Sequence, residues 1–174
     1  MKLRELLNGL TILSSSADLD AHIREVRYDS RAVETGDLFV AITGAETDGH
    51  KYIPMAREKG AACVVCQTVP RDGTPYVQVA DTRLALAALA AWYRSRFDLP
   101  VVQITGSAGK TTTKEMVAAV LSQRYDTLKT QANFNNDIGT PLTLLGLAPE
   151  HQAAVIETGM NHFGDIEYLG AMVR

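Results

Sequence analysis

The sequence lacks a long hydrophobic run, which excludes a membrane-spanning helix as its organising feature. Its most apolar stretch, residues 84–93, is flanked by arginines and is shorter than the roughly 20 residues that a span requires. The opening MKLRELLNGL alternates charge with leucine, unlike the unbroken apolar segment of a signal peptide. We therefore expect a protein that works in the cytoplasm and is not inserted into a membrane.

Basic clusters and repeats are also absent. Lysine and arginine form no block, and the formal net charge is -3, so we expect no nucleic-acid partner. The sequence has no internal repeat and no low-complexity tract. Apolar residues at 46% and charged residues at 21% are ordinary for a packed globular protein, and 174 residues suffice for one domain or two small ones. The oligomeric state stays open.

Cysteine is scarce, with two residues, Cys63 and Cys66, in the segment AACVVCQ. This spacing matches a redox pair or half of a zinc site. The segment is also short, apolar and rich in β-formers, which favours a buried strand. Positions three apart in a strand point to opposite faces, so the two thiols would not face each other. We interpret both as strand core in a reducing compartment.

Residues 1–81 predict a small α/β unit of short elements. Glycines at positions 9 and 60 end two predicted helices, and turn-rich segments such as ETGD and VPRDGTP separate the strands. The predicted helices cover residues 2–8 and 51–59, and the predicted strands cover residues 23–28, 38–42, 62–66 and 76–79.

The pattern of predicted elements changes at residue 82, and residues 82–174 predict a second domain. A glycine-free helix over residues 82–97 is followed by strands at 101–104, 126–130 and 153–157, with a helical segment after each. Such alternation indicates a parallel sheet with right-handed crossovers. A doubly wound nucleotide domain usually has about five or six strands. Three are visible here, so we expect this domain to be incomplete.

The sharpest motif is VVQITGSAGKTTTKE, residues 101–115. Gly106 and Gly109 allow a tight turn whose N–H groups face phosphate oxygens at a helix N-terminus. Lys110 can reach the outer phosphates, and the Thr111 hydroxyl can bind magnesium. A strict phosphate loop has four residues between its glycines, whereas this one has two, so a glycine-rich turn without a ligand is the alternative. The residues predicted to line this phosphate-binding loop are Thr105, Gly106, Ser107, Ala108, Gly109, Lys110, Thr111 and Thr112.

Four segments together resemble the Mur ligases. TGSAGKTTTKEM resembles their shortened ATP loop, although that loop alone would also fit folylpolyglutamate synthase and cyanophycin synthetase. NFNNDIGTPLTLL (133–145) and VIETGMNHFGDIEYL (155–169) resemble further segments of the family, with Asp165 where glutamate is commoner. Residues 28–61 resemble its uridine-binding domain. The resemblance spans nearly the whole chain.

The resemblance implies a fold and an activity. The fold would be a small N-terminal α/β uridine-nucleotide-binding domain, followed by the first part of a parallel-sheet, P-loop central domain. The activity would be ATP- and Mg²⁺-dependent amide ligation in peptidoglycan precursor synthesis. Phosphate would pass from ATP to the carboxylate of a UDP-N-acetylmuramoyl tripeptide, and the amine of D-alanyl-D-alanine would attack the acyl phosphate.

Two alternatives stay open beside this interpretation. One is the family member that adds a diamino acid, and the other is a nucleotide-binding fragment without turnover. Because the family's second magnesium-binding group, its modified lysine and its third domain have no counterpart in these residues, we expect the isolated chain to be inactive. The sequence does not tell whether the tripeptide ends in lysine or diaminopimelate.

The resemblance also assigns residues. Lys110 and Glu157 would be catalytic, with Thr111 and Glu157 holding magnesium; Glu157 ends an apolar strand, at the edge where such sheets bind ligands. Asn136 would lie beside the ATP phosphates and Asn135 beside the muramoyl substrate, although both could be turn residues.

The uridine nucleotide would be bound by Ser30, Arg31, Gly49 and His50. Arg31 could equally pair with a nearby aspartate, and His50 could be a hydrogen-bonding spacer.

Overall fold

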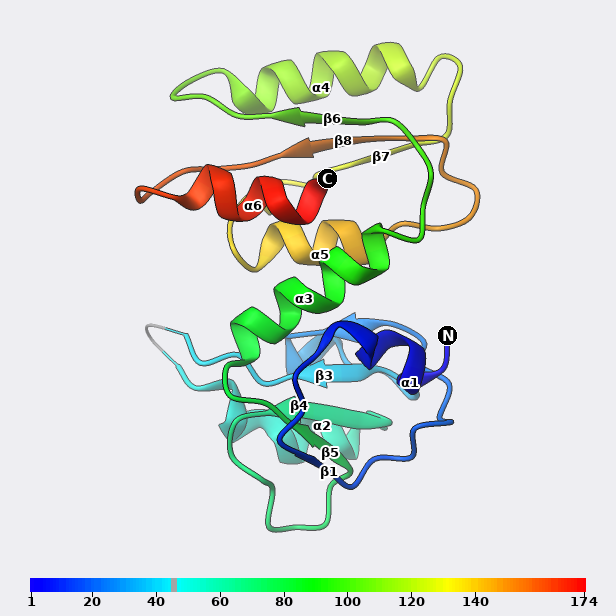
Figure 1. Ribbon diagram of the computed structural model, residues 1–174, viewed down its shortest axis with the longest axis vertical. Helices are drawn as coiled ribbons and strands as arrows, with labels where there is room; N and C mark the ends of the chain where they lie inside the picture. The colour runs from blue at the N-terminus through cyan, green and yellow to red at the C-terminus, as the bar shows by residue number, and fades with distance from the viewer. Residues whose placement is uncertain (45–46) are drawn as a thin grey trace. The chain divides into compact units, whose positions relative to one another are not determined.

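The computed structural model describes residues 1–44 and 47–174. Contacts between Cα atoms divide the chain into two compact units, residues 1–86 and 87–174, and each has its own sheet (Figure 1). The predicted α/β class with parallel strands is confirmed. None of the helices in the described ranges is long and apolar enough to cross a membrane.

The first unit contains a five-stranded sheet in the order β1-β5-β4-β3-β2. Strands β2 to β5 are parallel to their neighbours, while β1 pairs antiparallel with β5. The bounds are β1 Ser14–Ser15, β2 Val26–Arg27, β3 Leu38–Val40, β4 Cys63–Cys66 and β5 Tyr76–Gln78. Strand β1 was not predicted, because two serines at a sheet edge carry no apolar pattern.

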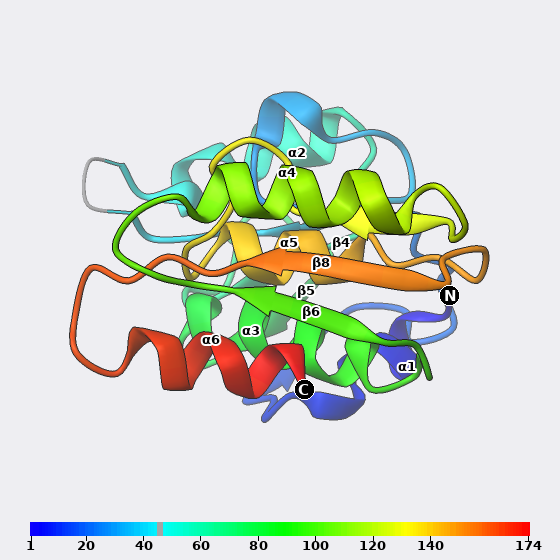
Figure 2. The same cartoon turned by 90° about the horizontal axis from the view of Figure 1, so that it is seen from above.

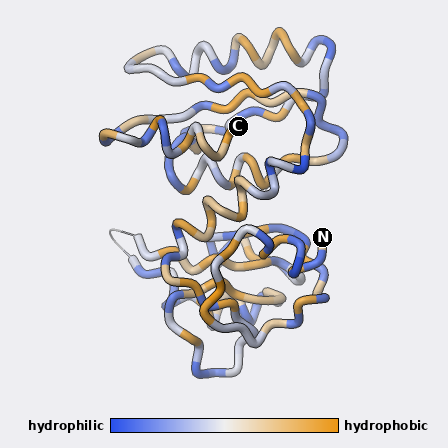
Figure 3. The backbone as a smooth tube through the Cα atoms, viewed as in Figure 1, coloured by the Kyte–Doolittle hydropathy of each residue, from blue (hydrophilic) through white to orange (hydrophobic). Residues whose placement is uncertain are grey.

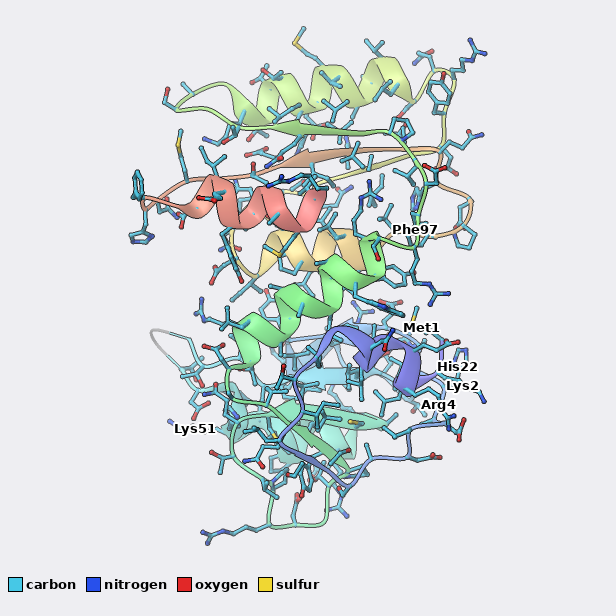
Figure 4. All side chains as sticks on the ribbon, viewed as in Figure 1. Met1, Lys2, Arg4, His22, Lys51 and Phe97 are labelled. Atoms are coloured by element: carbon cyan, nitrogen blue, oxygen red, sulfur yellow. The ribbon has the colours of Figure 1, made fainter. Side chains whose placement is uncertain are left out.

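Short helices flank this sheet. They are α1 Leu3–Leu6, the 3₁₀ turns η1 Leu7–Gly9, η2 Ser30–Ala32 and η3 Gly49–Tyr52, and α2 Ile53–Glu58. Helix α2 buries Ile53 and Ala56 against Phe39 and Val64 of the sheet. The start of the chain is held by polar contacts near His22, whose Nε2 lies 2.9 Å from the Met1 amino group (Figure 4).

Cys63 and Cys66 both lie in β4 and are fully buried as free thiols. Burial raises the pKa of Cys63 to about 12, with a smaller contribution from Cys66, and raises the pKa of Cys66 to about 11. The thiolate is the reactive form, so both groups are inert near neutral pH. The interpretation of these residues as strand core is confirmed.

The second unit is a three-stranded parallel sheet in the order β6-β8-β7. Helix α4 covers one face, and α5 and α6 cover the other (Figures 1 and 2). The bounds are β6 Val101–Ile104, α4 Lys110–Leu121, β7 Thr127–Lys129, α5 Gly139–Leu145, β8 Ala153–Glu157 and α6 Asp165–Val173. Helix α3, Thr82–Arg94, includes residues of both units.

The central strand β8 is buried along its whole length, and the hydrophobic colour follows it in Figure 3. Its alternate side chains point to opposite faces of the sheet. Val155 packs with Ile104 and Ala118 under α4, while Ala154 and Ile156 join the core that α5 and α6 cover. Because side chains alternate along a strand, Glu157 follows Val155 onto the α4 face.

Gly139, the first residue of α5, is required by close packing. A Cβ there would lie 2.3 Å from the Phe134 Cα. We expect Gly139→Ala to lower the free energy of unfolding by about 2–3 kcal/mol, because overpacking forces the backbone apart. Urea denaturation followed by circular dichroism measures this change.

Gly170 in α6 provides the matched control. Its added Cβ would meet Gln103 at 3.5 Å, an ordinary contact. Gly170→Ala should therefore leave stability unchanged or raise it by about 0.5–1 kcal/mol, the usual gain of alanine over glycine in a helix. Equal stability of Gly139→Ala and the unsubstituted chain would contradict the packing argument.

Candidate functional site

A glycine-rich loop joins β6 to α4 at the carboxyl edge of the second sheet. Gly106 has φ of +146° and Gly109 has φ of +75°, values that favour glycine. A Cβ on Gly109 would meet nothing within 4 Å, so this glycine is needed for conformation and not for space. Helix α4 begins directly after it, and its first N–H groups have no partner within the helix.

Lys110 lies over this loop. Its Nζ donates a hydrogen bond to the Gly106 carbonyl oxygen at 2.7 Å. The ammonium group is thereby held beside the loop and the N-terminus of α4. A cation beside unpaired N–H groups at one helix end forms an anion-binding arrangement.

The other residues predicted to bind nucleotide share this region. Thr105, Ser107 and Ala108 are exposed residues of the loop, and Thr112 is exposed on the first turn of α4.

Glu157 lies at the end of β8 and is 1% exposed. Its Oε1 accepts hydrogen bonds from Asn135 Nδ2 at 2.7 Å and from Thr111 Oγ1 at 3.2 Å. Its Oε2 is buried and has no hydrogen-bond partner within residues 1–44 and 47–174. Thr111, Asn135 and Glu157, three predicted site residues that are distant in sequence, therefore lie in contact. One oxygen of the carboxylate remains for a ligand.

Asn135 and Asn136 have different roles in the structure. Asn135 bonds Glu157 through its side chain, and its carbonyl oxygen accepts from Gly159 N at 2.6 Å. The Asn136 Oδ1 instead accepts from the backbone N–H groups of Gly139 and Ile138, at 2.8 and 3.2 Å. Asn136 thus caps the start of α5, whereas Asn135 contacts Glu157.

Lys114 is a site residue that sequence reasoning missed. It is 1% exposed, and its Nζ lies 4.0 Å from Glu157 Oε2. Its position three residues after Thr111 and four after Lys110 was the available signal, because such residues share one face of a helix. A lysine that follows three threonines and precedes a glutamate otherwise indicates a solvated charge.

Ser30 and Arg31, in the first unit, contact near neighbours. The Ser30 hydroxyl donates to Met55 Sδ at 3.3 Å. Arg31 is mostly exposed and bonds Asp29, with Nη2 2.7 Å from Oδ2. This side-chain hydrogen bond holds the pKa of Asp29 below its usual value. The alternative pairing of Arg31 with a nearby aspartate is thus the one seen.

His50 is held at both ring nitrogens. Gln67 N donates to Nε2 at 2.8 Å, so the ring proton is on Nδ1, which lies 2.6 Å from Asp48 Oδ1. The backbone N–H of His50 also bonds Asp48 and is the main reason that the pKa of Asp48 is lowered. At Gly49 a Cβ would lie 2.6 Å from the Ile42 carbonyl oxygen. Gly49 and His50 therefore shape the backbone of this loop.

Two family models match the sequence. The model described as "Mur ligase family, catalytic domain" matches residues 22–94, and the model described as "Mur ligase middle domain" matches residues 104–174. The UDP-N-acetylmuramoyl-tripeptide–D-alanyl-D-alanine ligase of Escherichia coli is 43% identical over 173 residues, which cover 99% of this chain and 37% of the relative.

Solved structures of MurF ligases also resemble this chain. A crystal structure of MurF from Acinetobacter baumannii superposes with a TM-score of 0.92 at 36% identity, over 99% of this chain and 38% of that one. MurF ligase from Thermotoga maritima, solved in complex with ADP, gives a TM-score of 0.79 at 33% identity, over 86% of this chain and 35% of that one.

A more distant structure, a UDP-N-acetylmuramoyl-L-alanyl-D-glutamate–2,6-diaminopimelate ligase, shares the fold, with a TM-score of 0.60 at 18% identity over 99% of this chain and 38% of that one. The chain spans less than two fifths of the length of these proteins.

Proposed function

Because this chain belongs to the Mur ligase family, we propose that it supplies the nucleotide-binding and UDP-substrate-binding parts of an ATP-dependent D-alanyl-D-alanine-adding ligase. The substrates would be ATP, UDP-N-acetylmuramoyl tripeptide and D-alanyl-D-alanine, and the product an amide in peptidoglycan precursor synthesis. The free, buried cysteines fit a cytoplasmic reaction.

The observation that carries the proposal is the pairing of the glycine-rich loop with a buried, partly unsatisfied carboxylate. Lys110 and the loop N–H groups suit the phosphates of ATP. The Thr111 hydroxyl and the Glu157 carboxylate are hard oxygen ligands 3.2 Å apart, which suits magnesium. The partnerless Oε2 of Glu157 is costly to bury unless a ligand satisfies it.

Each residue then has a role in phosphoryl transfer. Lys110 would turn from the Gly106 carbonyl to the outer phosphates and neutralise charge that shifts in the transition state. Thr111 and Glu157 would hold the magnesium ion, which supplies charge neutralisation and alignment of the phosphates. Asn135 would hold the Glu157 carboxylate in place through its 2.7 Å hydrogen bond.

The choice of D-alanyl-D-alanine over a diamino acid rests on the comparisons. The relatives that share 36–43% identity with this chain are named as UDP-N-acetylmuramoyl-tripeptide–D-alanyl-D-alanine ligases or MurF, whereas the diaminopimelate ligase shares 18%. We further propose that the UDP-binding domain covers residues 1–81 and the ATP-binding domain residues 82–174, because α3 begins at Thr82. Ser30, Arg31, Gly49 and His50 would lie near the uridine nucleotide, and Asn136 near the ATP phosphates.

Calorimetric titration of the 174-residue chain tests this proposal. We expect it to bind ADP more tightly with magnesium than with EDTA, and to bind UDP-N-acetylmuramoyl tripeptide separately. No phosphate release dependent on D-alanyl-D-alanine is expected, since acyl transfer requires the amine to be held in line. A chain that is folded by circular dichroism and binds neither ADP nor the UDP compound would overturn the proposal.

A further inference from the structure

Lys114 is a buried cation with specific polar partners. Lysine is almost never fully buried unless it is paired, yet Lys114 is 1% exposed. It lies on α4 one turn after Lys110, on the face that packs against β7 and β8. Its neighbour Glu115 is exposed and pairs both with Lys114, at 3.0 Å, and with Lys129.

The Lys114 ammonium, through Thr130, links α4 and β8, which carry the two candidate metal ligands, to the end of β7. Its Nζ donates to the Thr130 carbonyl oxygen at 2.7 Å, just past the end of β7. The Thr130 hydroxyl in turn accepts from the Glu157 N–H at 2.9 Å, at the end of β8. Thr130 is itself fully buried. Lys114 and Thr130 therefore join α4 to β7 and β7 to β8 at the level of Glu157.

The distance between Lys114 and Glu157 is informative. At 4.0 Å from Oε2, the ammonium balances the carboxylate charge without a hydrogen bond to that oxygen. A direct hydrogen bond would occupy the oxygen. The ammonium instead bonds Thr130 and Glu115, so Oε2 stays without a partner while Oε1 is shared with Thr111 and Asn135.

We propose that Lys114, acting with Thr130, is a positioning residue that holds Thr111 and Glu157 at the spacing needed to bind a divalent cation. This inference rests on the proposed function, in which Thr111 and Glu157 are the ligands. Lys114 does not touch the nucleotide. It acts by fixing α4 against the ends of β7 and β8 and by balancing the buried carboxylate.

The test measures ADP affinity of the 174-residue chain by calorimetry, in EDTA and in magnesium. Partners behind metal ligands typically contribute about 10- to 100-fold to metal affinity. We expect Lys114→Met to reduce the magnesium-dependent gain in ADP affinity by at least about ten-fold. The ADP affinity in EDTA should stay unchanged. Lys114→Arg, which keeps the charge, should recover most of the gain.

Lys129→Met is the matched control. Lys129 pairs with the same Glu115 but is partly exposed and lies in β7, so its loss should leave the magnesium-dependent gain intact. A lysine with a merely structural role would change the melting temperature in Lys114→Met and leave the ratio of the two ADP affinities unaltered. An unaltered ratio therefore overturns the inference.

Glu157→Gln separates this inference from the proposed function. If the unsubstituted chain shows no magnesium-dependent gain, or Glu157→Gln retains it, the proposed metal site fails. If Glu157→Gln loses the gain and Lys114→Met keeps it, only the role of Lys114 fails. If Lys114→Met does not fold, the double variant Lys114→Met/Glu157→Gln tests whether Lys114 balances the buried charge of Glu157. Recovered folding supports the charge pairing, and continued failure to fold overturns it.

Discussion

Replacing Lys110 with alanine is expected to lower ligase turnover by about 10²- to 10³-fold, the usual effect of removing one preorganised charge or donor from a transition state. The setting is a full-length ligase in which residues 1–174 replace the corresponding segment of the Escherichia coli relative, 43% identical to this chain. The measurement is steady-state phosphate release dependent on D-alanyl-D-alanine.

The fold should survive this change. The Lys110 side chain is half-buried, and its Nζ donates a hydrogen bond to the Gly106 carbonyl oxygen of the loop. Little core packing is lost, so the melting temperature should stay close to that of the unsubstituted protein. Arg124→Ala, on the exposed turn after α4, serves as a control for loss of a positive charge. Near-normal turnover of Lys110→Ala would remove the basis for assigning a phosphate loop.

The sequence predicts the centre of the second unit well because local signals agree there. An apolar strand, two glycines and a run beginning with Lys110 each favour the same strand–loop–helix unit, which the structure contains. The position of Glu157 at the end of β8 also follows from a short apolar run with a charge at its end. Such features depend on neighbours in sequence, so sequence alone shows them.

Contacts between separate elements were not predictable in the same way. The contact of Lys114 with Thr130 joins α4 to the end of β7, 16 residues later, and neither residue carries a local signal of burial. The capping contact of Asn136 agrees with its interpretation as a turn residue, whereas the family resemblance implied a place beside the ATP phosphates. Likewise, the double restraint on His50 requires Gln67, 17 residues away. Tertiary packing decides the Lys114 and His50 contacts, whereas the Asn136 cap is a local contact with Gly139, three residues later.

Replacing Glu157 is expected to have an effect of similar size, but one that depends on the metal. Glu157→Ala removes one carboxylate oxygen that lacks a hydrogen-bond partner among the described residues and a second that accepts from Thr111. If these oxygens bind magnesium, water must replace a charged ligand, and the ion binds more weakly. In the same full-length ligase we expect turnover to fall by about 10²- to 10³-fold at ordinary magnesium, comparable to other lost electrostatic contributions.

The magnesium titration distinguishes this effect from simple damage. Because weaker binding can be offset by mass action, raising the magnesium concentration should restore part of the Glu157→Ala activity and none of the activity lost in Lys110→Ala. Glu150→Ala, in the exposed turn before β8, is the control for a lost carboxylate and should behave as the unsubstituted enzyme. Glu157→Ala also leaves Lys114 with Glu115 as its remaining acidic partner, so melting curves must accompany the kinetics. A folded Glu157→Ala enzyme with an unchanged magnesium requirement would show that this carboxylate is not a metal ligand.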